Sequence, residues 1–103
     1  MIPVVIIEGP TASGKSALAM ALAEHLGSQI ISADSRQVYK YLDIGTAKPG
    51  LDDRKRIAHH LIDFLEPSEA YNAGAYVKDA GKICLSLDEQ GLVPIICGGT
   101  GLY

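Results

Sequence analysis

The sequence predicts an α/β fold in which a parallel sheet is flanked by helices. Apolar runs at residues 3–8, 29–33 and 92–97 alternate with segments of helical periodicity. Runs that are apolar throughout are typical of strands buried on both faces, as in a parallel sheet. The chain has 103 residues, 48% of them hydrophobic, which suffices for one small core and excludes both a second domain and wholesale disorder.

The first third of the chain predicts a strand–helix–strand unit. The run Pro3–Glu8 is the first strand, because it stops at a Gly-Pro pair. Apolar residues then recur at helical spacing until Gly27, the expected helix stop. The run Gln29–Ala33 is the second strand and leads directly into Asp34. The helix positions expected to face the core are Leu18, Ala19, Leu22, Ala23 and Leu26.

The rest of the chain predicts further units of the same kind. Residues 35–58 are polar and basic, which predicts a long loop with a short helix at 52–58. An extended segment at 60–65 follows, and then a helix that Asn72 caps and Gly91 ends. The run 92–97 is the last buried strand. The expected core face of the long helix comprises Ala73, Tyr76, Val77, Ala80, Ile83, Cys84 and Leu87.

Charge, cysteines and histidines limit the classes of function. The net charge is −3, but residues 36–56 carry six basic side chains against three acidic ones, and such a segment can meet a polyanion. No run approaches the ~20 apolar residues of a membrane span, which predicts a cytoplasmic protein. Cys84 and Cys97 lack metal or redox spacing and are expected to be buried thiols. His59 and His60 are adjacent, which predicts one buried and one exposed ring.

The strongest local signal is a glycine-rich loop of the pattern GxxxxGK[ST] between the first strand and the first helix. Its amides can wrap a di- or triphosphate at the positive end of the helix dipole. Lys15 adds a charge that reaches the terminal phosphates, and Ser16 can hold Mg²⁺. The predicted phosphate-binding residues are Gly9, Pro10, Thr11, Ala12, Ser13, Gly14, Lys15 and Ser16.

Polar residues follow two other predicted strands. Asp34 follows a predicted strand at the position where ligands bind in open α/β sheets. It could hold magnesium or act as a general base, and the alternative is a purely structural role as a helix cap or turn residue. Arg36 can pair with phosphate, and Gln37 can bind a base edge. Thr100 lies in a second glycine-rich turn, 98–101, which is expected to open toward the same cleft. From spacing alone, that turn is equally explained by backbone geometry.

Five motifs, in order, resemble those of the tRNA dimethylallyltransferases (tRNA isopentenyltransferases): GPTASGKS at 9–16, ISADSRQVY at 31–39, DIGTAKP at 43–49, HHLID at 59–63 and GGTGLY at 98–103. The resemblance implies a P-loop NTPase-like fold and transfer of a dimethylallyl group from dimethylallyl diphosphate to N6 of an adenosine beside the anticodon of tRNA. It implies that the loop 9–16 binds the donor's diphosphate with Mg²⁺, and that Asp34 is the general base. The residues that would contact the tRNA are Asp34, Ser35, Arg36, Gln37 and Thr100.

The resemblance also implies that residues 1–103 are the N-terminal part of a prenyltransferase core, because family members are about three times longer. Full-length members are expected to be monomers, and their central first strand would have one edge exposed here. Three alternatives stay open. They are a small-molecule or nucleotide kinase, an adenylate isopentenyltransferase that uses a free nucleotide, and a non-catalytic phosphate-binding fragment.

Overall fold

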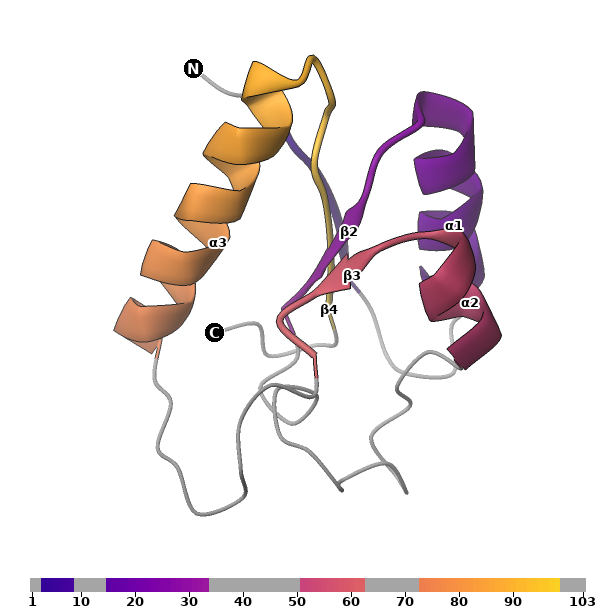
Figure 1. Ribbon diagram of the computed structural model, residues 1–103. Helices are drawn as coiled ribbons and strands as arrows, with labels where there is room; N and C mark the ends of the chain where they lie inside the picture. The colour runs from indigo at the N-terminus through magenta and orange to yellow at the C-terminus, as the bar shows by residue number, and fades with distance from the viewer. Residues whose placement is uncertain (1–2, 9–14, 34–50, 63–72, 99–103) are drawn as a thin grey trace.

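A four-stranded parallel sheet lies between helices on its two faces (Figure 1). The computed structural model describes residues 3–8, 15–33, 51–62 and 73–98. The strands are β1 (Val5–Glu8), β2 (Ile30–Ser32), β3 (His59–His60) and β4 (Ile95–Gly98), and their order in the sheet is β1-β4-β2-β3. Every pairing is parallel, so the predicted α/β class is confirmed.

The last strand, β4, lies between β1 and β2. Ile95 is in register with Val5 of β1 on one side and with Ile30 of β2 on the other, and it is 0% exposed. A strand with neighbours on both edges and helices over both faces is largely shielded from water, and in β4 Ile95 and Gly98 are buried while Ile96 and Cys97 are half-buried. This position explains why the run 92–97 is apolar throughout.

The helices divide between the two faces of the sheet, as Figure 1 shows. The helices α1 (Lys15–Leu26) and α2 (Leu51–Arg56) lie on one face, and α3 (Ala73–Glu89) lies on the other. Ala19 and Ala23 of α1 are 1% and 0% exposed, and such short side chains let the helix pack closely on the sheet. The first core cluster is Ile7, Ala19, Met20, Ala23, Ile30, Ile57 and Ile95, and the second is Ile31, Ala33, Tyr76, Ala80 and their partly buried neighbours.

Three predicted core positions are wrong. Leu18 and Leu26 of α1 are 52% and 39% exposed, whereas Met20 is buried. In a helix that is apolar almost all round, spacing does not identify the buried stripe. Val77 of α3 is 67% exposed. The core cluster under α3 draws on β2 and β4 but on no residue of β1.

The segment predicted to be extended at 60–65 forms a strand of only two residues, His59–His60. Leu61 adopts a φ of 64°, a left-handed conformation that ends the strand immediately. Both histidines are half-buried, so the expected pair of one buried and one exposed ring is wrong. Cys84 and Cys97 are thiols, as expected, but each is half-buried rather than fully buried.

The predicted helix stops are confirmed. Gly27 and Gly91 follow α1 and α3 with φ values of 64° and 77°, which L-residues rarely adopt. Across the described residues, no helix is long and apolar enough to cross a membrane.

Candidate functional site

The candidate site lies at the end of the sheet where β1, β4 and β2 have their carboxyl ends. We call this end the candidate edge. Glu8 and Gly98 are register partners at this edge, and the Ala33 amide donates a hydrogen bond of 2.9 Å to the Cys97 carbonyl. Each of these three strands is followed by one of the predicted motifs, at 9–16, 34–37 and 98–101. The topology therefore starts all three motifs from neighbouring positions on one edge, where ligands bind in open α/β sheets.

The N-terminus of α1 contributes to the same edge. The helix runs antiparallel to the strands (Figure 1), so its first turn lies at their carboxyl ends. The backbone of Lys15 and Ser16 forms the start of this helix. The amides of a first helical turn have no partner within the helix and carry the positive end of its dipole, so they favour a bound phosphate.

The remaining predicted site residues lie outside the described part of the chain. The roles that the sequence assigns to them therefore stay predictions. The same holds for the side chains of Lys15 and Ser16, of which the structure describes only the backbone. Within the described residues, no group of three histidine, cysteine, aspartate or glutamate side chains is placed to hold a metal ion. The predicted residues outside the description are Gly9, Pro10, Thr11, Ala12, Ser13, Gly14, Asp34, Ser35, Arg36, Gln37 and Thr100.

Two buried serines lie at the ends of β2, Ser28 just before the strand and Ser32 as its last residue, and the sequence analysis did not assign either of them a role. Ser28 is 4% exposed, and its Oγ donates a 2.7 Å hydrogen bond to the Val93 carbonyl. Ser32 is 3% exposed and lies in register with Cys97 at the candidate edge. A hydroxyl inside an otherwise apolar run is the only sequence signal for such residues, because its partner lies far along the chain.

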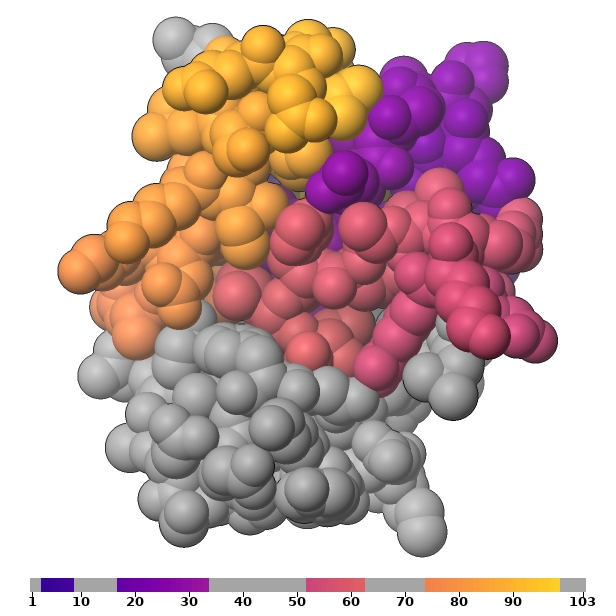
Figure 2. Space-filling view, viewed as in Figure 1, coloured from indigo at the N-terminus to yellow at the C-terminus, as the bar shows by residue number. Residues whose placement is uncertain are grey.

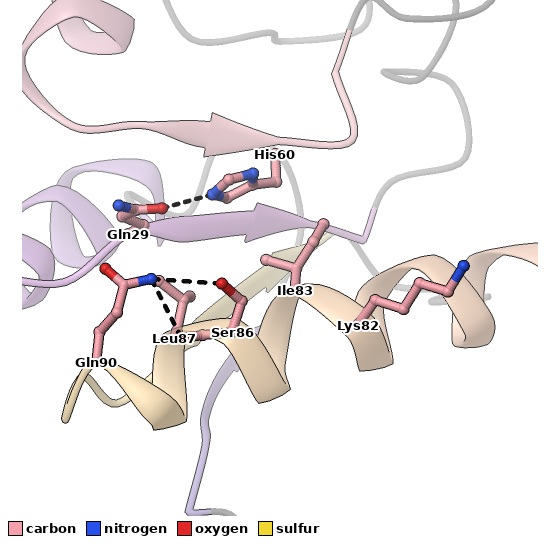
Figure 3. Close-up of a pocket in the computed structure, with 7 residues that line it drawn as sticks. All are labelled: Gln29, His60, Lys82, Ile83, Ser86, Leu87 and Gln90. Carbon is pink, nitrogen blue, oxygen red and sulfur yellow. Dashed lines mark hydrogen bonds between the residues drawn. The ribbon is translucent and has the colours of Figure 1, made fainter.

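A hollow separate from the candidate edge lies between α3 and the amino end of β2 (Figure 3). His60 Nε2 and Gln29 Oε1 are 2.6 Å apart, so the ring nitrogen donates to the amide oxygen. Lys82 points away from this pair. Gln29 precedes β2 and Gln90 follows α3, so these two lining residues lie at the end of the sheet opposite to the candidate edge. It has a volume of about 200 Å³ and is lined by Gln29, His60, Lys82, Ile83, Ser86, Leu87 and Gln90.

Both histidines of β3 resist protonation, and His60 is the one that lines the hollow. Burial lowers the pKa of His60, and the neighbouring His59 lowers it further. Burial also lowers the pKa of His59, although its Nδ1 donates a 2.7 Å hydrogen bond to the Ile57 carbonyl, which acts in the opposite direction. Both rings are therefore neutral at neutral pH.

The basic segment is partly neutralised where it forms α2. Arg56 pairs with Glu24 of α1 and lies 3.8 Å from Asp53. These side chains border a cavity of about 370 Å³ between α1 and α2. Figure 2 shows residues 52–62 as the surface between α1 and α3 on this side of the molecule. The ion pair of Arg56 with Glu24 thus connects α2 to α1. Lys55 of α2 is exposed.

An open parallel sheet with a helix N-terminus at its strand ends, and a glycine-rich motif between strand and helix in the sequence, is typical of α/β proteins of the P-loop class. The isopentenyl transferase family matches residues 2–63, and the IPP transferase family matches residues 37–103. Each match covers more than half of the chain. The chain belongs to the tRNA dimethylallyltransferase (IPP transferase) family.

Individual relatives agree with this assignment. A tRNA dimethylallyltransferase of Desulfosudis oleivorans is 52% identical over 100 residues, which cover 97% of this chain and 32% of that protein. The crystal structure of a tRNA isopentenylpyrophosphate transferase of Bacillus halodurans superimposes with a TM-score of 0.93 at 41% identity, covering all of this chain and 34% of that one. The structure of a eukaryotic dimethylallyltransferase acting on tRNA superimposes with a TM-score of 0.89 at 33% identity. The match covers 95% of this chain and 24% of that one. The chain thus spans about a third or less of the length of these relatives.

Proposed function

We propose that this chain forms the donor-binding part of a tRNA dimethylallyltransferase, which moves a dimethylallyl group from dimethylallyl diphosphate to N6 of an adenosine beside the anticodon. The observation that carries the proposal is the edge where β1, β4 and β2 end, because three of the five family motifs lie at these strand ends. Because the chain spans about a third of its relatives, the whole reaction belongs to the longer protein.

The proposed chemistry follows from the charge that develops on the donor. The allylic C–O bond breaks, diphosphate leaves, and a C–N bond forms to N6. The amides of loop 9–16 and of the first turn of α1, together with Lys15, stabilise the departing diphosphate. Asp34 accepts the proton that N6 loses. Magnesium, when bound, would neutralise the diphosphate, and the hydroxyl of Ser16 is an oxygen ligand suited to it.

The proposed acceptor contacts come from the segments that follow β2 and β4. The target adenine must leave its stack before its N6 can reach the donor. Ser35, Arg36 and Gln37 would hold the tRNA, and Thr100 would line the channel. We place the reaction in the cytoplasm, where we expect the anticodon arm of tRNA to be the partner, and we expect the full-length relatives to be monomers.

Donor binding is the first test. Calorimetric titration of the 103-residue chain, with Mg²⁺ present, should give tighter binding of dimethylallyl thiodiphosphate than of ATP. Lys15→Ala should weaken donor binding by about tenfold or more, because a charged contact to phosphate is worth roughly 1.5–3 kcal/mol. Asp34→Ala is the matched control and should bind the donor almost normally. A preference for ATP would instead support a kinase, and unchanged binding by Lys15→Ala would remove that residue from the site.

Catalysis needs the longer protein. We would replace the matching third of the Bacillus halodurans relative with residues 1–103 of this chain and measure prenylation of tRNA and of free AMP. Asp34→Ala should slow transfer to tRNA by about 10²–10⁴-fold, the usual contribution of a general base. Wild-type rates in that variant would contradict the assigned base. Efficient prenylation of AMP would favour an adenylate isopentenyltransferase.

A further inference from the structure

The hollow between α3 and the amino end of β2 has the size of a small ring compound. Its volume is about 200 Å³, whereas the pockets of drug-sized ligands usually measure about 300–1,000 Å³. Ile83 and Leu87 of α3 form its apolar wall (Figure 3). A flat ring packed against this wall would remove apolar surface from water, which favours binding.

The amide of Gln29 is held in one orientation beside this wall. His60 Nε2 donates to Gln29 Oε1 at 2.6 Å, so the amide nitrogen of Gln29 is turned away from the ring (Figure 3). A half-turn of the amide would bring its N–H groups against the ring N–H, and the hydrogen bond would be lost. Gln29 therefore offers a hydrogen-bond donor to the hollow.

The amide of Gln90 is held in the opposite sense. Its Nε2 donates to the Ser86 carbonyl at 3.1 Å and lies 3.4 Å from Ser86 Oγ. A carbonyl accepts hydrogen bonds and donates none, so the amide oxygen of Gln90 cannot replace the nitrogen there. This oxygen is turned away from Ser86, and Gln29 and Gln90 lie at the same end of the hollow (Figure 3). That end thus combines one fixed donor with one fixed acceptor.

The polar groups beside the apolar wall carry no charge. Burial lowers the pKa of His60, so its ring is neutral at neutral pH. Of the seven described residues that line the hollow, only Lys82 is a cation, and its side chain points away from the His60–Gln29 pair (Figure 3). The donor, the acceptor and the wall therefore match an uncharged ring compound with hydrogen-bonding groups on one edge.

We propose that this hollow binds adenine, as the free base or as adenosine. Gln29 Nε2 donates to a ring nitrogen of adenine, Gln90 Oε1 accepts from the adjacent N6 amino group, and the ring packs on Ile83. Glutamine amides pair with adenine through these groups, because a ring nitrogen and the N6 amino group place an acceptor beside a donor. The hollow and the candidate edge lie at opposite ends of the sheet, so this site is separate from the proposed transfer site and does not depend on it.

NMR titration of the isotope-labelled chain with adenosine tests the ligand. The side-chain amide signals of Gln29 and Gln90 should shift together and saturate at about millimolar concentrations, the range of so small a ligand. Inosine should bind at least about tenfold more weakly, because its oxygen replaces the N6 amino group and would face the Gln90 oxygen. AMP should bind no more tightly than adenosine. Absence of the shifts, equal binding of inosine, or tighter binding of AMP by about tenfold would overturn the proposal.

A matched pair of variants tests the residues. Gln90→Leu removes the acceptor at an exposed position and should raise the dissociation constant for adenosine by at least about tenfold. Glu89→Leu makes a similar change at the neighbouring exposed position, which does not line the hollow, and should leave binding unchanged. Equal effects of the two substitutions would contradict a site at Gln90.

Dimethylallyl thiodiphosphate separates this site from the proposed transfer site. A saturating amount should leave the dissociation constant for adenosine unchanged, because the two sites lie at opposite ends of the sheet. Competition between the two ligands would place adenosine at the candidate edge and overturn the proposal. The fusion with the Bacillus halodurans relative should show the same shifts of Gln29 and Gln90. Their loss in the fusion would show that the longer protein fills the hollow, which also overturns the proposal.

Discussion

At the scale of single residues, a few polar side chains connect segments that are distant in the sequence. Ser28 reaches the Val93 carbonyl across 65 positions, and Gln29 reaches His60 across 31. A buried polar group without a partner costs about 1–3 kcal/mol, so these bonds favour the observed alignment of β2 with its neighbours. The sequence shows the serine and the histidine but not their partners.

The half-buried histidines make the stability of the fold depend on pH. Burial lowers the pKa of His59 and His60 below 6.5, so as pH falls below 6.5 the unfolded chain binds more protons than the folded one until the folded rings also become protonated. Stability is therefore complete above the unfolded pKa and decreases as pH falls through 6.5 toward the lower folded values. Denaturant unfolding at pH 7.5 and at about pH 5.5 should show this decrease.

Histidine variants separate this effect from the titration of carboxylates. The double variant with His59→Gln and His60→Gln should lose most of the decrease between those pH values, because it has no buried ring to protonate. His25→Gln is the control, since His25 is exposed in the last turn of α1 and its replacement leaves both buried rings in place. An unchanged decrease in the double variant would show that other groups cause it.

At the scale of elements, glycines outside the helices and glycines within them have opposite effects. Gly91 ends α3 at a φ of 77°, and a Cβ there would meet nothing within 4 Å. Gly81 lies within α3, where a Cβ also meets nothing within 4 Å. Space is thus equal at the two positions, and backbone conformation alone distinguishes them.

The substitution of each glycine by alanine should therefore change stability in opposite directions. Gly91→Ala should lower the free energy of unfolding by about 1 kcal/mol, because alanine is strained at positive φ. Gly81→Ala should raise it by up to about 1 kcal/mol, the difference in helix propensity. Thermal unfolding of the two variants beside the parent chain measures both effects. Changes of the same sign would contradict the role assigned to the stop at Gly91.

At the scale of the whole molecule, stability depends most on the central strand. Ile95 is 0% exposed and is in register with β1 and β2 together. Ile95→Ala should destabilise the chain by about 2–5 kcal/mol, a large part of the 5–15 kcal/mol of a typical domain. Leu85→Ala, at an exposed position, should stay within about 0.5 kcal/mol. Equal unfolding midpoints for the two variants in denaturant would contradict the central place of β4.

By itself, the sequence determined the α/β class, the strand runs, the glycine stops and the motifs that identify the family, because each depends on residues close together in the chain. The tertiary structure alone decided the order β1-β4-β2-β3, which starts three motifs from one edge of the sheet. It also decided that Met20 rather than Leu18 is buried, and that Ile6 and Val77 stay exposed. The physical reason is that burial depends on which distant segment covers a side chain, and the periodicity of one helix or strand carries no information about that segment.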